Sequence, residues 1–94
     1  MMTWPGGLRV HLACGVTDMR KAIDTLVVLA AEQLHQDPLS GHLFGFCNRK
    51  RDTVKLLYWD RNGFCLWRKR LERDRFHWPD SESEVRLIST RELR

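Results

Sequence analysis

The sequence predicts an α+β fold, in which a mostly antiparallel sheet of about five to six short strands packs against one main helix at residues ~18–35. Three observations support this fold. One long stretch carries apolar residues at helical spacing, several later stretches alternate or are rich in β-branched and aromatic residues, and short polar turns separate those stretches. The 94 residues suffice for a single domain spanning 1–94.

The helix is expected to begin at Thr17, whose hydroxyl can cap the free N–H groups of a first turn. Pro38 should end it near Gln36, because the residue before a proline avoids helical angles. The stripe expected to face the core consists of Met19, Ile23, Leu26, Val27, Ala30 and Leu34.

Arg20 and Lys21 would then lie in the first helical turn, where the helix dipole disfavours positive charge. We therefore expect them to contact an anion or a carboxylate of the sheet. Two solvated side chains at Arg20 and Lys21 are an equally good interpretation.

The first strand is expected at residues 8–14, with His11 on the face opposite Val10 and Leu12. Asn62-Gly63 predicts a hairpin in which these two residues form the centre of a type I′ turn. Further strands are expected at 43–48, 53–60, 64–72 and 85–89, with 75–79 as a short strand or an extended edge.

The C-terminal region contains a helix-start signal close to the last residue. Ser89 and Glu92 are three positions apart and match a capping box. Because only two residues follow Glu92, the C-terminal helical segment is expected to be truncated.

The composition excludes several classes of protein. No apolar run is long enough for a membrane helix, and the N-terminal residues lack the apolar core of a signal peptide, so a cytoplasmic protein is expected. The three cysteines are far apart and form no CxxC pair, which argues for reduced, mostly buried thiols. The sequence predicts no cofactor, no metal, no membrane partner and no small-molecule substrate.

Catalytic patterns are weak throughout. Asp18, Asp24 and Asp60 are candidates for a metal cluster by position only, and each suits a turn or a helix surface. A cysteine nucleophile is conceivable for pairs drawn from Cys14, Cys47 and Cys65 with His11, His42 and His77. We expect a protein that is not an enzyme.

Positive charge is concentrated between residues 48 and 75, where ten bases face four acids, a net +6 in a chain whose total is +4. Such a segment is typical of a polyanion binder, since each phosphate contact releases counterions. The predicted nucleic-acid contacts are Arg49, Lys50, Arg51, Lys55, Arg61, Arg68, Lys69, Arg70, Arg73 and Arg75.

Aromatic residues alternate with these bases and leave two interpretations open. They could stack on unpaired bases, or they could anchor a protein partner. On the strand at 53–60, both faces carry apolar groups, so one face needs a second cover. The residues expected in stacking or protein contact are Trp59, Trp67 and Trp78.

Three stretches resemble a known family: PGGLRVHLACG (5–15), GVTDMRKAIDTL (15–26) and DPLSGHLFGFCNRKRDTVKLLYWDRNGFCLWRKRLERDRFHWP (37–79). They look like the TnpB accessory protein of bacterial insertion sequences of family sixty-six. The resemblance implies a small protein that assists DNA transposition beside a separate, larger transposase, with no recognised catalytic residues. Its characteristic positions here are Asp18, Met19, Arg20, Lys21, Trp59, Asp60, Gly63, Lys69, Arg70, Leu71, Glu72, Phe76, Trp78 and Pro79.

Together these features predict a non-catalytic accessory protein of transposition that contacts the backbone of duplex DNA, at the ends of the element, and works with the transposase. The alternative is a protein-interaction adaptor that binds the transposase or itself through exposed aromatic residues. A third hypothesis is an enzyme acting on DNA, with Asp60 as the residue to test.

Overall fold

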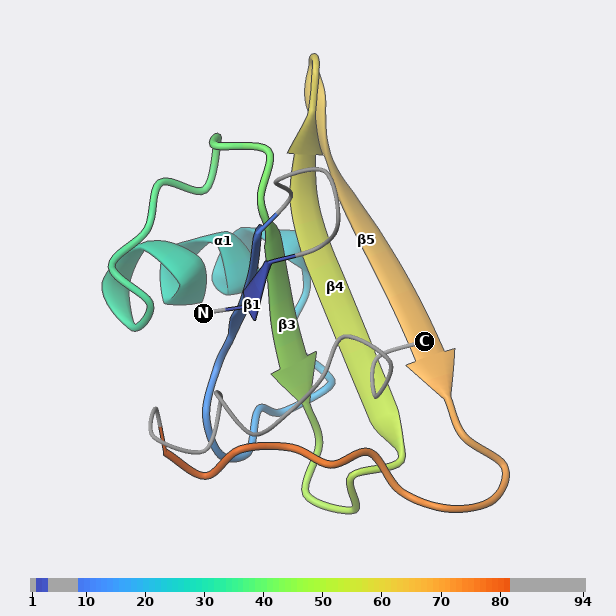
Figure 1. Ribbon diagram of the computed structural model, residues 1–94. Helices are drawn as coiled ribbons and strands as arrows, with labels where there is room; N and C mark the ends of the chain where they lie inside the picture. The colour runs from blue at the N-terminus through green and yellow to red at the C-terminus, as the bar shows by residue number, and fades with distance from the viewer. Residues whose placement is uncertain (1, 4–8, 82–94) are drawn as a thin grey trace.

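The computed structural model describes residues 2–3 and 9–81, which form a five-stranded sheet with one helix (Figure 1). The strands lie in the order β1-β2-β3-β4-β5, and every neighbouring pair is antiparallel except β2 and β3. The α+β prediction is confirmed. The elements are β1 (Met2–Thr3), β2 (Arg9–Leu12), α1 (Ile23–Glu32), β3 (Leu43–Cys47), β4 (Thr53–Asp60) and β5 (Gly63–Arg70).

The parallel pair, β2 and β3, is the one departure from hairpin connections. The chain leaves β2, passes through α1 and returns so that Val10 lies beside Leu43. Parallel neighbours need such a crossover, because a short turn can only reverse the chain. The helix therefore joins two strands as well as covering one face of the sheet.

The helix is shorter than predicted at both ends. It begins at Ile23 after Ala22, which provides no side-chain cap, and Thr17 is instead buried, with its N–H donating to the carbonyl oxygen of Cys47 at 2.8 Å. Residues 17 to 21 are thus held by the sheet and by a local turn before the helix starts. His35 adopts a left-handed φ of 53°, which an α-helix cannot contain, so the predicted extension to Gln36 is also wrong.

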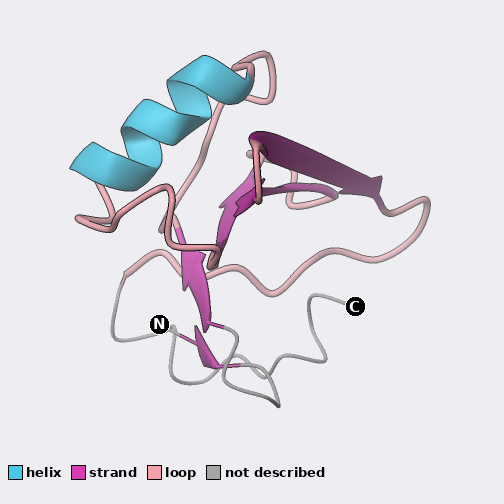
Figure 2. Cartoon of the chain, turned by 90° about the horizontal axis from the view of Figure 1, so that it is seen from above, coloured by secondary structure: helices cyan, strands magenta, loops and turns pink. Residues whose placement is uncertain are grey.

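The two faces of the sheet are covered by different parts of the chain (Figure 2). On one face, Leu26 and Ala30 of α1 pack with Phe44, Phe46 and Leu57. On the other, the extended residues 76–79, here called the covering segment, complete a second core. That core contains Val10, Leu12, Cys47, Val54, Leu56, Phe76 and Trp78. β4 carries apolar side chains on both faces, and the covering segment of the same chain packs over the face that α1 does not reach.

The β4–β5 hairpin is confirmed, but its turn lies one residue earlier than predicted. Asp60 pairs with Gly63, so Arg61 and Asn62 form the turn, with Arg61 at a left-handed φ of 56°. This register places Leu57 opposite Leu66. A turn centred on Asn62-Gly63 would instead bring Arg68 opposite the buried Leu57. Pairing of the apolar Leu57 with Leu66 therefore sets the register, although Asn62-Gly63 has the stronger turn propensity.

Three further expectations concern single segments. Residues 75–79 form no regular secondary structure and do not join the sheet, which corrects the short-strand interpretation. The strand predicted at 85–89 and the capping box at Ser89 and Glu92 lie outside the described residues. Within the described part of the chain, no helix is long and apolar enough to cross a membrane.

Candidate nucleic-acid interface

Basic residues gather at one end of the sheet, where β3 ends, β4 begins and β5 ends (Figure 1). Two backbone hydrogen bonds tie the β3–β4 turn to the chain that follows β5. The N–H of Leu71 donates to the carbonyl oxygen of Asp52 at 2.7 Å, and that of Phe76 to Arg51 at 2.7 Å. We call this the basic end; its bases are Arg49, Lys50, Arg51, Arg70, Arg73 and Arg75.

The turn that carries Arg49 and Lys50 is built by the side chains of Asn48 and Asp52. The Asn48 Oδ1 accepts the backbone N–H groups of Asp52 and Thr53, both at 3.1 Å, while its Nδ2 donates to Asp52 Oδ1 at 2.7 Å. The Asn48 hydrogen bond lowers the pKa of Asp52, so its carboxylate stays ionised at neutral pH. The two bases are exposed on a fixed turn rather than on a loose loop.

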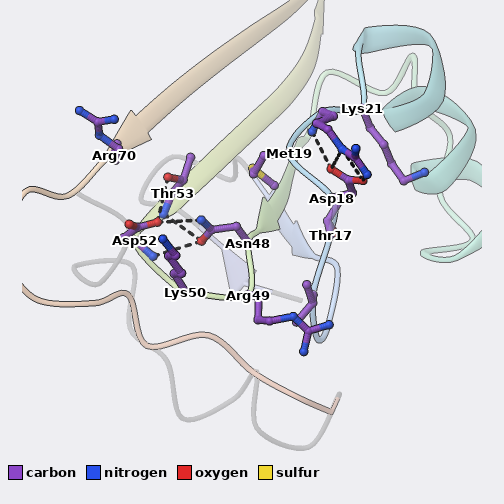
Figure 3. Close-up of a pocket in the computed structure, with 12 residues that line it drawn as sticks. Thr17, Asp18, Met19, Lys21, Asn48, Arg49, Lys50, Asp52, Thr53 and Arg70 are labelled. Carbon is purple, nitrogen blue, oxygen red and sulfur yellow. Dashed lines mark hydrogen bonds and ion pairs between the residues drawn. The ribbon is translucent and has the colours of Figure 1, made fainter.

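Beside this turn lies an open cleft of about 860 Å³ on the helix side of the sheet (Figure 3). Residues 16–21 form one wall and residues 48–53 the other, with Arg70 of β5 also in the lining. Five bases and two acids line it, so the cleft carries a net positive charge. The bases are Arg20, Lys21, Arg49, Lys50 and Arg70.

Four of the predicted DNA-contacting bases at this end already have polar partners. Arg51 pairs with Asp80 at 2.9 Å, and Arg70 pairs with Glu72 at 3.1 Å, both on the exposed surface. Arg75 donates to the carbonyl oxygen of Asp74 at 2.8 Å, and Lys69 of β5 also has a polar or charged partner. Exposed pairs of this kind contribute about 0–1 kcal/mol, so a phosphate could replace the carboxylate.

Arg49, Lys50, Arg68 and Arg73 are exposed and make no ion pair within residues 9–81. Arg68 lies on the helix side of β5, opposite Lys55, whereas Lys69 lies on the other side, opposite Val54. The predicted triplet 68–70 is therefore divided between the two faces of the sheet.

Two predicted contacts do not belong to the interface. The ammonium group of Lys55 donates to the carbonyl oxygens of Met19 at 2.8 Å and Lys21 at 3.2 Å, so it holds the chain before α1 against the sheet. Arg61 lies at the tip of the β4–β5 hairpin, at the opposite end of the sheet from the basic end (Figure 1). Both were predicted as DNA contacts from composition, which does not reveal where a side chain is already used.

Arg20 and Lys21 were predicted in the first helical turn, and the structure corrects that position. Both residues precede α1 and do not lie in its first turn. Arg20 binds the carboxylate of Asp18 in its own turn, with 2.7 Å between its Nη2 and Asp18 Oδ2, and this hydrogen bonding lowers the pKa of Asp18 to about 2. The expected carboxylate contact exists for Arg20, but it is local rather than on the sheet. Lys21 lines the cleft.

The three tryptophans proposed as anchors differ in exposure. Trp78 is 3% exposed and donates its Nε1 hydrogen to the carbonyl oxygen of Ala13 at 2.8 Å, so it is a core residue and its prediction as a contact residue is wrong. Trp59 is half-buried and meets Phe64 edge to face, with 5.0 Å between ring centroids. Trp67 is 42% exposed on β5.

The catalytic candidates lie on separate elements. Asp18 is in the turn before α1, Asp24 on the helix and Asp60 at the end of β4. Within the described ranges, no three His, Cys, Asp or Glu side chains form a group that could hold a metal ion. Burial raises the pKa of the Cys47 thiol to about 11, which leaves it protonated and a weak nucleophile at neutral pH.

A histidine pair went unnoticed in the sequence. The Nε2 of His11 lies 3.2 Å from the Nδ1 of His42, and the His11 ring also stacks on Phe44 with 5.4 Å between centroids. His11 lies on the face opposite Val10 and Leu12, as predicted, and is buried there beside Phe44. The two histidines are 31 positions apart in the chain, so no local pattern reveals this contact.

Comparison with known proteins identifies relatives along nearly the whole chain. The profile of the family described as "IS66 Orf2 like protein" matches residues 8–94. An uncharacterized protein, y4hO, of Sinorhizobium fredii (strain NBRC 101917 / NGR234) is 41% identical over 86 residues, which cover 92% of this chain and 75% of that protein. A second uncharacterized protein of the same strain, y4jC, is 36% identical over 87 residues, covering 93% and 74%. No solved structure matches.

Proposed function

The chain belongs to the IS66 Orf2-like family of transposon accessory proteins, and we propose that it is a non-catalytic member that holds the phosphate backbone of duplex DNA at its basic end. One observation carries the proposal. Arg49, Lys50 and Arg73 are exposed at the basic end and make no ion pair in the described part of the chain. The cleft beside them adds Lys21.

The chemistry of this surface fits a polyanion without base specificity. Lysine and arginine side chains that neutralise phosphates release condensed counterions, so the affinity falls steeply with salt concentration. The rigid turn built by Asn48 and Asp52 supports two of these charges in fixed positions, which reduces the entropy lost on binding. The exposed pairs at Arg51 and Arg70 supply further charge once their carboxylates are displaced.

The test is fluorescence anisotropy with a duplex carrying the terminal repeat of the element and with a scrambled duplex, each across a salt series. The variant Arg49→Ala/Lys50→Ala removes two positive charges from the basic end. We expect weaker binding to both duplexes and a salt slope that is lower by about 2, or about 1 for each lost phosphate contact.

Arg61→Glu is the matched control, because it changes the net charge by the same amount at the opposite end of the sheet. Its duplex affinity should stay close to that of the unaltered protein. If both variants lose the same duplex affinity, binding depends on net charge and not on the basic end. No duplex binding at low salt would refute the proposal.

The second candidate function is a protein-interaction adaptor, which the exposed Trp67 favours. The partner would be the transposase of the same element. An interface anchored by an aromatic side chain is much less sensitive to salt than phosphate binding. Co-purification with the transposase in high salt, lost on Trp67→Ala, would favour this function over DNA binding.

Catalysis on DNA is excluded from the proposal and is tested separately. The purified protein should not nick duplex DNA in the presence of magnesium. Nicking that disappears on Asp60→Ala would instead establish an enzyme.

A further inference from the structure

The outer face of β5 presents an aromatic side chain that the fold does not cover. Trp67 is opposite Leu56, which belongs to the core beneath the covering segment, so both point away from α1. Phe76 and Trp78 are buried there, yet Trp67 remains 42% exposed. β5 is also the last strand in the order of the described sheet, so this face lies at a sheet edge.

A second aromatic residue lies beside Trp67 on the same face. Tyr58 pairs with Cys65, two residues before Trp67, so Tyr58 and Trp67 are diagonal neighbours in an antiparallel pair. Such neighbours are about 7–8 Å apart, and Tyr58 is half-buried, so part of its side chain is accessible. Two aromatic rings at this spacing offer stacking surfaces for neighbouring unpaired bases.

Charge distinguishes between possible occupants of this face. From Arg68 to Arg75, five bases accompany two acids, so the chain that follows Trp67 is positive, and Lys69 of this stretch shares the face of Trp67. A second copy of this surface would be repelled, whereas a nucleic acid would be attracted. Duplex DNA keeps the flat faces of its internal bases within its own stack, whereas a single strand offers unpaired bases along its whole length for stacking on Trp67.

We propose that the face of β5 around Trp67 binds single-stranded DNA, with unpaired bases on Trp67 and Tyr58 and the backbone near Lys69, the base of β5 that lies on the same face. This inference rests on the proposed DNA-binding function and adds a second class of DNA to it. The basic end takes duplex and β5 takes single strand, a combination suited to a DNA end where the strands separate.

The experiment measures anisotropy with oligodeoxythymidine and with a blunt duplex for the unaltered protein, Trp67→Ala and Trp67→Phe. Trp67→Ala should weaken binding to the single strand by about tenfold or more and change duplex affinity less than about twofold, because only the single strand loses a stacked base. Trp67→Phe should keep most of the single-strand affinity. Val28→Ala, which trims an exposed apolar residue of α1, should change neither.

The outcomes separate the two proposals. Single-strand affinity that is unaffected by Trp67→Ala, with duplex affinity still dependent on Arg49 and Lys50, would overturn the β5 site alone. Binding to neither DNA would overturn the proposed function as well. Self-association that Trp67→Ala removes, seen by sedimentation without a loss of single-strand binding, would make this face a protein interface and overturn the inference.

Discussion

The two faces of the sheet are covered by segments of very different length and kind. α1 spans ten residues, of which only Leu26 and Ala30 are fully buried. The covering segment spans residues 76–79 and buries Phe76, Trp78 and Pro79 without any regular secondary structure. Large aromatic side chains bury much more apolar area per residue than the side chains of a short helix.

The covering segment is also anchored by polar contacts at several points. Its Phe76 N–H bonds to Arg51, the carbonyl oxygen of Pro79 accepts the N–H of Gly15 at 2.9 Å, and Trp78 bonds to Ala13. These contacts reach the β3–β4 turn and the chain after β2. An irregular segment can therefore complete a core when its side chains are large and its backbone groups are satisfied.

The sharpest way to break this comparison is Trp78→Ala. It removes a buried indole and leaves the carbonyl oxygen of Ala13 without this donor, so we expect a loss of about 3–5 kcal/mol in the free energy of unfolding, measured by urea denaturation. Trp78→Phe keeps an aromatic ring but loses the N–H donor, so its free energy of unfolding should lie between those of the unaltered protein and Trp78→Ala. A loss below about 1 kcal/mol for Trp78→Ala would mean that α1, not the covering segment, dominates the core.

A smaller effect is expected from Gly45→Ala, which tests how tightly the covered face is packed. A Cβ at Gly45 would lie 2.9 Å from Leu12 Cδ2 and 3.0 Å from Trp78 Cη2, so the side chains must shift. Overpacking of this kind costs about 1–3 kcal/mol, readable from the same denaturation curves. Gly63→Ala is the control, since nothing lies within 4 Å of its Cβ, and it should be close to neutral. Equal stability of both variants would show a loosely packed face.

The sequence predicted the fold well where local signals agree with one another. The strand at 53–60 was predicted with its observed bounds, because β-branched and aromatic residues there meet no competing local signal. The start of α1 was misplaced, because Asp18 makes a local turn with Arg20 and Lys55 holds the preceding carbonyl groups. A local turn and a contact between residues 36 positions apart together decided where α1 starts.

The candidate interface was likewise predictable where local signals decide and not where distant contacts do. Residues 49 and 50 were correctly placed on an exposed tip, since charged neighbours between two strands have few alternatives. The role of Lys55 and the burial of Trp78 depend on partners 36 and 65 residues away, which periodicity does not reveal. Composition identified the charge of the segment but not its division between two faces.

The smallest expected effect concerns pH and the helix side of the sheet. Burial, with repulsion from His42, lowers the pKa of His11 below its usual 6.5. The unfolded chain therefore binds the proton first as the pH falls below 6.5, and the free energy of unfolding should decrease there, by at most about 1.4 kcal/mol per pH unit for one proton. From about one pH unit above 6.5 this contribution should be constant.

Thermal melts between pH 5 and 8 measure this dependence. His11→Phe, which keeps an aromatic ring on Phe44, should flatten it, whereas His77→Phe at an exposed site should not. Asp18, with a pKa of about 2, makes a constant contribution above its unfolded value of 3.8 and loses it only at lower pH, so it adds no slope between pH 5 and 8. An unchanged slope in His11→Phe would assign the pH dependence to another group.

The hydrogen bond from Trp78 to Ala13 also has a consequence during synthesis of the protein. It joins residues 65 positions apart, so β2 emerges from the ribosome long before its cover exists. Until then, the apolar side chains of Val10, Leu12, Val54 and Leu56 have nothing over them, as in the aggregation-prone intermediates of other slow, long-range folds. Nascent chains that end before residue 76 should therefore depend on chaperones, and completion of the covering segment would release them.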